Sequence, residues 1–249
     1  MKRYVYLLFS CLIYCTAAQA QYWKGNDNPE AIQFTYTIQY VTSQYKVTPT
    51  ADWATQLMEN NVPLSPNLSH MRSPEAYGFA IGLGVSKGLG SNAELRFVPT
   101  LTIADRILTY SYHHVLDVNS TGDPVYSKDR KVQASLVELP LSIKLKSDQR
   151  GYFGAYVTGG LKYSADISSS KRSDDSEMIA FEKMLKNKRS YVSYEAGLGL
   201  DLYFRYFKLS PEIKYSASFN SILQQENSVF SKPIDKLMLR NVTFSLYIQ

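Results

Sequence analysis

The sequence predicts an all-β protein, an eight-stranded antiparallel transmembrane β-barrel of the outer-membrane type. Three observations support this prediction. Strand-like segments alternate between bulky apolar and small side chains, the connections between them alternate in length, and the N-terminus resembles an export signal. Barrels of this type combine long extracellular loops with short periplasmic turns.

The N-terminal segment predicts a signal peptide over residues 1–20. A basic Met-Lys-Arg start is followed by a mostly apolar stretch and by an Ala-Gln-Ala cleavage site at 18–20. The mature chain, residues 21–249, is expected to form one barrel domain. It has no cysteine, because Cys11 and Cys15 both lie within the signal. Disulfide bonds and thiol catalysis are therefore excluded.

The composition limits the classes of partner. The formal net charge of +5 falls by two when Lys2 and Arg3 leave with the signal, and so mild a surplus does not indicate nucleic acid binding. Outer-membrane lipid and lipopolysaccharide are the partners expected from the location. No mature stretch approaches the roughly 20 apolar residues that a membrane helix needs.

Eight segments predict strands, with connections of two kinds between them. The strands are expected at 32–45, 77–87, 92–112, 130–147, 151–165, 190–204, 207–219 and 236–249. Long connections at 46–76, 113–129, 166–189 and 220–235 alternate with short ones at 88–91, 148–150 and 205–206. This order puts both termini on the short-turn side, which is periplasmic in such barrels.

Side-chain alternation is clearest in two of these segments. At 77–86, large residues such as Tyr77 and Phe79 alternate with glycine, alanine and serine, and the pattern recurs at 192–202. A period of two indicates a strand whose faces meet different surroundings. The bulky face suits lipid and the small face suits a narrow lumen. A soluble lipocalin-like barrel is an alternative, but it would expose the glycine-rich face to water.

A two-residue loop at Arg205–Tyr206 predicts the register of the sixth and seventh strands. The predicted pairs are Phe204–Phe207, Leu202–Leu209, Leu198–Ile213 and Ala196–Tyr215 on the outer face, and Gly199–Glu212 and Gly197–Lys214 on the inner face. Pairing small residues with long ones is how a narrow barrel fills its interior.

Prolines and aromatic residues raise two further expectations. Pro99, Pro140 and Pro211 fall inside predicted strands, where bulges or shifted strand ends would accommodate them. Aromatic rings at strand ends predict girdles at the membrane interface, although such rings favour any sheet. The expected girdle residues are Tyr203, Phe204, Tyr206 and Phe207 at a short turn and Tyr110, Tyr112, Tyr191 and Tyr194 near the outer rim.

Catalysis has one candidate pair, Ser111 and His113. The two residues share a strand face at a spacing of about 7 Å. A hydrolytic triad also needs a carboxylate and an oxyanion hole, and neither lies nearby in the sequence. Adjacent His113 and His114 point to opposite strand faces, which disfavours joint metal binding. We expect no catalytic, metal-binding or cofactor-binding residue and no cofactor.

Ten charged residues are predicted to face the barrel interior. They are Glu94, Arg96, Glu138, Lys144, Lys162, Glu195, Asp201, Lys208, Glu212 and Lys214. Five acids and five bases can neutralise one another, and unpaired charge in a lumen would cost several kcal/mol. The expected role is therefore a structural ion-pair network. A catalytic carboxylate dyad among the glutamates would lack a route for substrate.

One long connection contains a predicted amphipathic helix at 173–187. Met178, Phe181 and Leu185 share one face, with acids at the start and lysines near the end. The helix is expected either to fold onto the barrel rim or to bind a partner.

Three stretches carry a resemblance to known barrels. Residues 135–146, Ser-Leu-Val-Glu-Leu-Pro-Leu-Ser-Ile-Lys-Leu-Lys, resemble a Glu-x-Pro-Leu strand of outer-membrane barrels of the Bacteroidetes type. Residues 194–201, Tyr-Glu-Ala-Gly-Leu-Gly-Leu-Asp, and residues 208–216, Lys-Leu-Ser-Pro-Glu-Ile-Lys-Tyr-Ser, together resemble the PorT family of the type IX secretion machinery. The similarity runs over most of the mature chain. The end at 244–249 departs from other outer-membrane barrels because it lacks a terminal aromatic residue.

The resemblance implies a non-enzymatic subunit that helps to export or mature cargo such as proteases, together with other secretion components. It brings no catalytic residues. Eight strands enclose an interior that side chains just fill, so the barrel alone should not pass a folded protein. A generic small barrel for adhesion, envelope integrity or ligand binding is one alternative, and a lipid A-modifying enzyme is another.

Overall fold

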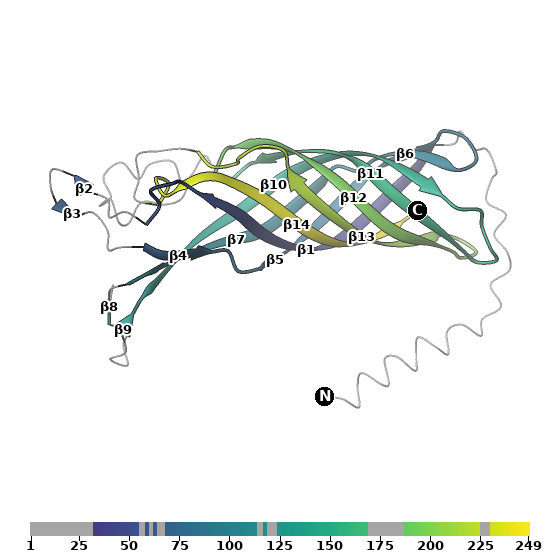
Figure 1. Ribbon diagram of the computed structural model, residues 1–249. Coiled ribbons are helices and arrows are strands. Elements are labelled where there is room, and N and C mark those ends of the chain that lie inside the picture. The colour runs from purple at the N-terminus through teal and green to yellow at the C-terminus, as the bar shows by residue number, and fades with distance from the viewer. Residues whose placement is uncertain are drawn as a thin grey trace, which may run out of the picture.

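Long strands run obliquely around a common axis in the computed structural model (Figure 1). The structure describes residues 32–54, 58–59, 62–63, 68–113, 117–118, 124–168, 187–224 and 230–249. The barrel strands are β1 (Ile32–Pro49), β5 (Ala76–Gly88), β6 (Ala93–Phe97), β7 (Thr100–Tyr112), β10 (Ser127–Lys146), β11 (Phe153–Asp166), β12 (Ser190–Tyr203), β13 (Lys208–Ser218) and β14 (Ile234–Ile248). The short strands β2 (Met58–Glu59), β3 (Val62–Pro63), β4 (Leu68–Arg72), β8 (Asp117–Val118) and β9 (Pro124–Val125) lie in long connections.

Antiparallel pairing closes the sheet into a ring. β1 pairs with β14 on one side and with β5 on the other. β6 and β7 are two parts of one strand, since both pair with β5 and β10 in an unbroken register. The ring therefore has eight strands, which confirms the predicted fold. Within the described ranges, no helix is long and apolar enough to cross a membrane.

The three prolines inside the strands cause no bulges, contrary to one of the two expectations. The ladder simply skips the positions around Pro99 and Pro140, which lie beside each other on neighbouring strands, and resumes in the same register. At Pro211 the pairing of β12 with β13 skips two positions in the same way. A proline cannot donate to the ladder, so each costs local hydrogen bonds without changing the direction of any side chain.

The predicted hairpin register is confirmed. All five predicted pairs from Leu202–Leu209 to Ala196–Tyr215 occur between β12 and β13, and the Phe204 N–H donates to the Phe207 carbonyl at 3.0 Å. The side chains of Phe204 and Phe207 stack with ring centroids 4.7 Å apart.

The two ends of the barrel differ. The short turns, Ile32 and Gln249 lie at one end, where Ile32 pairs with Lys87 and Lys208 exchanges backbone hydrogen bonds with Gln249. We call this the short-turn end. The long connections lie at the other end, the loop end. There β4, which the sequence did not predict, pairs with the end of β7 above the point where β5 begins.

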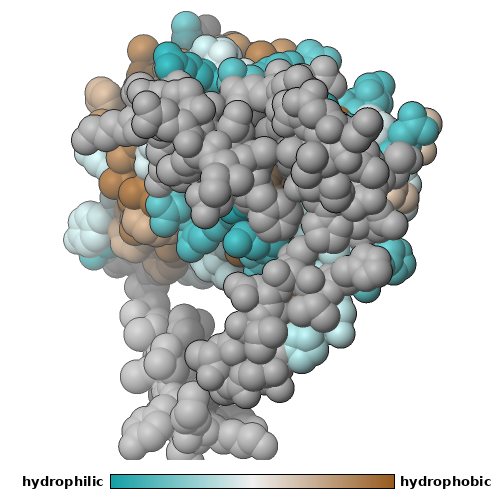
Figure 2. Space-filling model, turned by 90° about the vertical axis from the view of Figure 1, so that its left-hand side faces the viewer, coloured by the Kyte–Doolittle hydropathy of each residue, from teal (hydrophilic) through white to brown (hydrophobic). Residues whose placement is uncertain are grey.

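The outer face of the barrel changes character along its length. From the short-turn end upward it is an apolar belt of exposed side chains such as Phe34, Ile38, Ile81, Leu198 and Phe244. Nearer the loop end the same faces carry polar residues. Viewed from the loop end, the space-filling surface shows apolar residues on the flank of the barrel and hydrophilic residues at the rim (Figure 2).

Aromatic rings mark the upper edge of the apolar belt, with one correction to the predicted girdle. Tyr40 stacks on Tyr77 at 5.9 Å, and Tyr194 packs against Phe219 at 5.4 Å, all four exposed. Tyr110 and Tyr112 are instead 1% and 5% exposed inside the barrel, and Tyr191 faces inward as well. These three positions have inward parity, which aromatic content alone does not reveal.

Candidate functional site: the barrel interior

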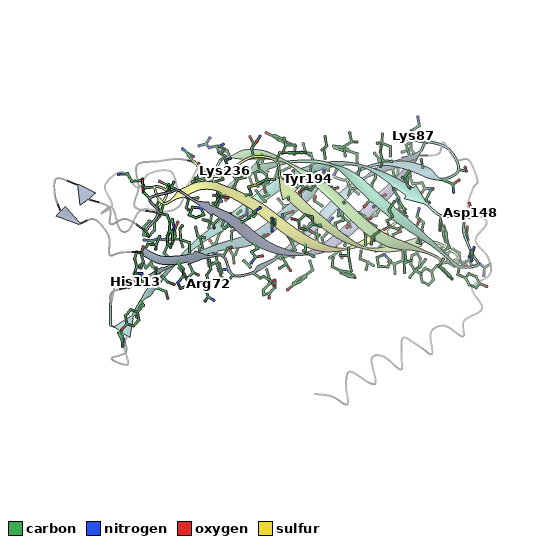
Figure 3. The ribbon with its side chains drawn as sticks, in the orientation of Figure 1. Arg72, Lys87, His113, Asp148, Tyr194 and Lys236 are labelled. Carbon is green, nitrogen blue, oxygen red and sulfur yellow. The ribbon has the colours of Figure 1, made fainter. Side chains whose placement is uncertain are left out.

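All ten charged residues expected inside are in the interior, each between 0% and 7% exposed. The register explains this placement, because every one of them has inward parity on its strand. They come from β6, β10, β11, β12 and β13 and so line the barrel around most of its circumference. Figure 3 draws the side chains along these strands as sticks.

Four of them form two ion pairs near the short-turn end. The guanidinium of Arg96 donates to Glu212 at 2.9 Å, and the ammonium of Lys144 donates to Asp201 at 2.7 Å. Arg96 also lies over the ring of Tyr247, 4.4 Å from its centroid. Charged groups in a dry interior need such partners, because an unpaired charge loses its hydration without compensation.

A second group lies at mid-height. Lys162 pairs with Glu138 at 2.9 Å, and the hydroxyls of Thr102 and Ser164 donate to the same carboxylate at 3.0 and 3.3 Å. Lys214 donates to the Tyr247 hydroxyl at 2.7 Å. One cation and two hydroxyls thus satisfy a buried carboxylate, which is the arrangement expected of a structural pair.

The remaining members contact the network at its edges. Glu94 pairs with Lys146 at 3.5 Å, and Lys208 donates to the Gln33 side chain at 3.4 Å. Glu195 lines the same small cavity as Lys162. Lys146 was not among the residues predicted to face the interior, although its parity matches that of Lys144.

Glycines on the inner face make room for the long side chains. A β-carbon at Gly197 would lie 2.6 Å from Cγ of Lys214, closer than real contacts allow. One at Gly199 would collide with the ring of Tyr156. The small residues on this strand face are therefore required because opposite side chains occupy the centre of a narrow barrel.

Among the described side chains, little free space lies between the charged groups at mid-height. The cavity between Glu138, Lys162, Glu195 and Lys214 has a volume of about 10 Å³, close to the minimum for a single water molecule. Within the described residues, this part of the barrel therefore offers room for neither a substrate nor a translocating chain.

Towards the loop end the interior becomes apolar. We call this cluster the apolar plug; it consists of Tyr45, Leu68, Leu108, Tyr110, Tyr112, Ile222, Leu223, Phe230, Ile234, Leu237 and Leu239. The ring of Phe230 is fully buried, and its backbone carbonyl accepts a hydrogen bond from the Tyr110 hydroxyl at 2.7 Å. Burial raises the pKa of Tyr112 to about 12, as expected where a phenolate would lack water.

Arg106 separates the charged network from the apolar plug. It is 2% exposed and donates to the Tyr191 hydroxyl at 2.8 Å. Arg106 was not among the residues predicted to face the interior. Its parity matches that of Arg96, and the unbroken register through Pro99 is the signal that could have placed it inside.

The proposed Ser–His pair does not form a catalytic arrangement. Ser111 lies opposite His70 of β4, while His113 is exposed beyond the end of β7. Among the described residues, His70 has no hydrogen bond to a carboxylate that could orient its imidazole. No group of three or more His, Cys, Asp or Glu side chains in the described ranges could hold a metal ion. His114, the predicted helix up to residue 186 and residues 1–20 lie outside the described ranges.

A closed antiparallel barrel with an apolar outer belt and a filled polar interior defines the class of outer-membrane β-barrel proteins. The chain belongs to the outer membrane protein beta-barrel domain family, whose profile matches residues 31–224. The protein is therefore an outer-membrane barrel. A search of characterised proteins gives no significant match.

Solved structures with a similar arrangement include three bacterial outer-membrane proteins. Neisserial surface protein A is 9% identical over 88% of this chain and 99% of its own, with a TM-score of 0.40. OprG from Pseudomonas aeruginosa is 9% identical over 88% and 93%, with a TM-score of 0.41. Ail of Yersinia pestis, solved with a heparin analogue, is 12% identical over 88% and 99%, with a TM-score of 0.35.

Proposed function

We propose that the protein is a non-enzymatic subunit of the type IX secretion machinery that acts through its surface. The observation that carries this proposal is the filled interior. Within the part of the chain that the structure describes, ion pairs near the short-turn end and the apolar plug near the loop end occupy the lumen and leave no room there for a channel or a substrate. What remains for function is the outer wall and the two ends.

The PorT-like stretches support the assignment to a secretion subunit. Residues 194–201 and 208–216 lie on the neighbouring strands β12 and β13, and their charged residues point into the barrel. The motif therefore specifies how this barrel is filled. Proteins that share these inward-pointing residues would share the architecture of the barrel interior. The secretion machinery would then contact the exposed parts of the barrel.

The proposal includes an orientation. The short-turn end, with Gln249, faces the periplasm, and the signal peptide at 1–20 is removed during export. Components of the machinery in the periplasm would then meet the short turns, whose exposed aromatic residues include Tyr152 and Tyr206.

Deletion of the gene tests the proposal. In the deletion strain, cargo proteases should accumulate in the periplasm and disappear from the medium, while export of other proteins to the periplasm continues. Complementation with the wild-type gene should restore secretion. Normal extracellular cargo in the deletion strain would contradict the secretion role and leave the generic barrel for adhesion, envelope integrity or ligand binding.

The same deletion strain distinguishes the proposed non-enzymatic role from the enzymatic alternative. A chain with Ser111→Ala and His113→Ala should restore secretion fully, because neither residue belongs to a built site. A double variant that reaches wild-type abundance in the outer membrane but fails to restore secretion would favour a catalytic role. Lipid A of unchanged chemical structure in the deletion strain is the matching expectation.

A further inference from the structure

Three cations lie on the outer face between the apolar belt and the loop end. Lys46 lies on β1, and Lys236 and Arg240 lie on β14, all three exposed. Their parity is outward, because the adjacent residues Tyr45, Leu237 and Leu239 belong to the apolar plug. Figure 3 labels Lys236 towards the loop end of the barrel. We call these three residues the basic triad.

The strand register fixes the spacing of the basic triad. Arg240 pairs with Gln44, Lys46 pairs with Met238, and Thr48 pairs with Lys236. Lys46 is thus one strand and two residues away from both Arg240 and Lys236, and its α-carbon lies about 8 Å from each of theirs. Arg240 and Lys236 are four residues apart, about 14 Å along the strand. Long flexible side chains can close these gaps onto one ligand.

Within the described part of the chain, none of the three residues of the basic triad forms an ion pair. By contrast, Lys131, which lies at a comparable height on β10, pairs with Asp105 at 2.8 Å. The neighbours of Arg240 on the adjacent strands are Gln44 and Ala217, which are uncharged.

The height of the basic triad relative to the membrane identifies its ligand. On β14 the outer face is apolar from Val242 downward, and on β1 it is apolar up to Tyr40. Tyr40 and Tyr77 stack at this boundary, as aromatic residues do at the level of lipid headgroups. Arg240 lies two residues above Val242, at the level where the phosphate groups of a lipid lie. Lys46 and Lys236 lie four and six residues above the level of Val242 in the register, and their long side chains can extend back towards the phosphates.

We propose that the basic triad binds the phosphorylated headgroup of a membrane lipid whose acyl chains lie against the apolar belt. The spread of the three cations fits a headgroup with two phosphates, such as that of lipid A, better than a single phosphate. This inference goes beyond the secretion role, requires only that the protein is an outer-membrane barrel, and would hold for the generic barrel as well.

Lipid retention by the purified full-length mature barrel tests the proposal. The protein in detergent micelles is mixed with bis-phosphorylated lipid A, with its dephosphorylated form, or with inorganic phosphate, and native mass spectrometry counts the lipids bound. We expect Lys46→Gln with Lys236→Gln and Arg240→Gln to lower the affinity for bis-phosphorylated lipid A by at least about tenfold. The matched control is Lys87→Gln with Arg150→Gln and Arg205→Gln, which removes three exposed cations from the short-turn end and should bind as the wild type does.

Three outcomes would overturn the proposal. Equal binding by wild type and the basic-triad variant would remove these residues from the site. Equal binding of the phosphorylated and dephosphorylated lipids would show that the acyl chains alone determine retention. Displacement of the lipid by millimolar inorganic phosphate would assign the cations to free phosphate. Because the side chains are exposed, the variant should keep the mobility shift of a folded barrel on unboiled gels, which separates lost binding from lost folding.

Discussion

The part of the barrel near the short-turn end (the lower part) and the part near the loop end (the upper part) place their apolar side chains on opposite faces of the barrel wall. In the lower part, the apolar side chains of β14 point outward at Val242 and Phe244, and polar ones point inward at Thr243 and Ser245. In the upper part of the same strand, Leu237 and Leu239 point inward and the outer face carries cations. The apolar residues therefore change from even to odd positions, although the register against β1 is unbroken at this level.

The reversal occurs at a similar level on other strands. On β1 the apolar residues change from outward Ile38 and Tyr40 to inward Val41 and Tyr45. On β7 they change from outward Leu101 and Ile103 to inward Leu108 and Tyr110. The backbone continues in one register while the surrounding solvent changes from lipid to water. Where lipid surrounds the barrel wall, the interior holds paired charges, which would be unfavourable in lipid. Where water surrounds the wall, the interior holds the apolar plug, whose exposure to water would be unfavourable.

Breaking a buried ion pair in the lower part should produce the largest loss. Arg96→Ala leaves Glu212 without its main cation in a dry interior, and we expect a loss of about 3–5 kcal/mol in the free energy of unfolding. The measurement is urea unfolding of the barrel refolded into lipid vesicles. The control is Lys131→Ala, whose partner Asp105 is on the exposed outer face of the upper part, and which should cost about 0–1 kcal/mol. Equal losses would contradict the difference between interior and exterior.

The second largest effect is expected when a cation is introduced on the outer wall, where its cost in stability should differ between the two parts. Leu198 is 68% exposed on the apolar belt, and Leu198→Arg should cost about 2–4 kcal/mol because the charge meets hydrocarbon. Thr48 is exposed on the outer face of the upper part, and Thr48→Arg should cost less than about 1 kcal/mol. Membrane levels and urea midpoints of the two variants provide the comparison. Similar values would show that lipid covers both heights or neither.

The smallest effect is expected at the boundary between the parts. Ser73 bridges β1 and β7 there, because its hydroxyl accepts from the Tyr45 N–H at 2.9 Å and donates to the Ile107 carbonyl at 2.8 Å. Ser73→Ala removes both bonds and should cost about 1–3 kcal/mol. Hydrogen exchange should increase at the upper end of β1 and remain unchanged at Phe34. Ser91→Ala, in an exposed short turn, is the control and should change neither quantity.

The sequence predicted the lower part well because lipid imposes a strict rule. All eight strands and the hairpin register followed from alternation and loop length, since a transmembrane strand must present apolar residues outward on every second position. The inward charges Lys144 and Asp201 followed from the same parity. Their pairing with each other, across strands that are not neighbours, could not, because the barrel shape determines which inward side chains meet.

The upper part was predicted poorly for a related reason. Because the solvent changes, the alternation of apolar residues shifts by one position between Leu239 and Val242. In a sequence, such a shift cannot be distinguished from the shift that a loop or a bulge would cause. Tyr110 and Tyr112 were therefore expected at the rim rather than in the apolar plug. Short β4 also escaped prediction, because five residues in a long connection carry too little alternation to indicate a strand.

Single-channel recording of the purified barrel in a planar lipid bilayer tests directly whether the interior is sealed. We expect no stable conductance, since paired charges leave a cavity of about 10 Å³ at mid-height and the apolar plug closes the upper part. A porin added afterwards to the same bilayer should give clear openings and so prove that channels would be detected. Large, steady openings from the isolated protein would contradict the sealed interior and the eight-strand ring on which it depends.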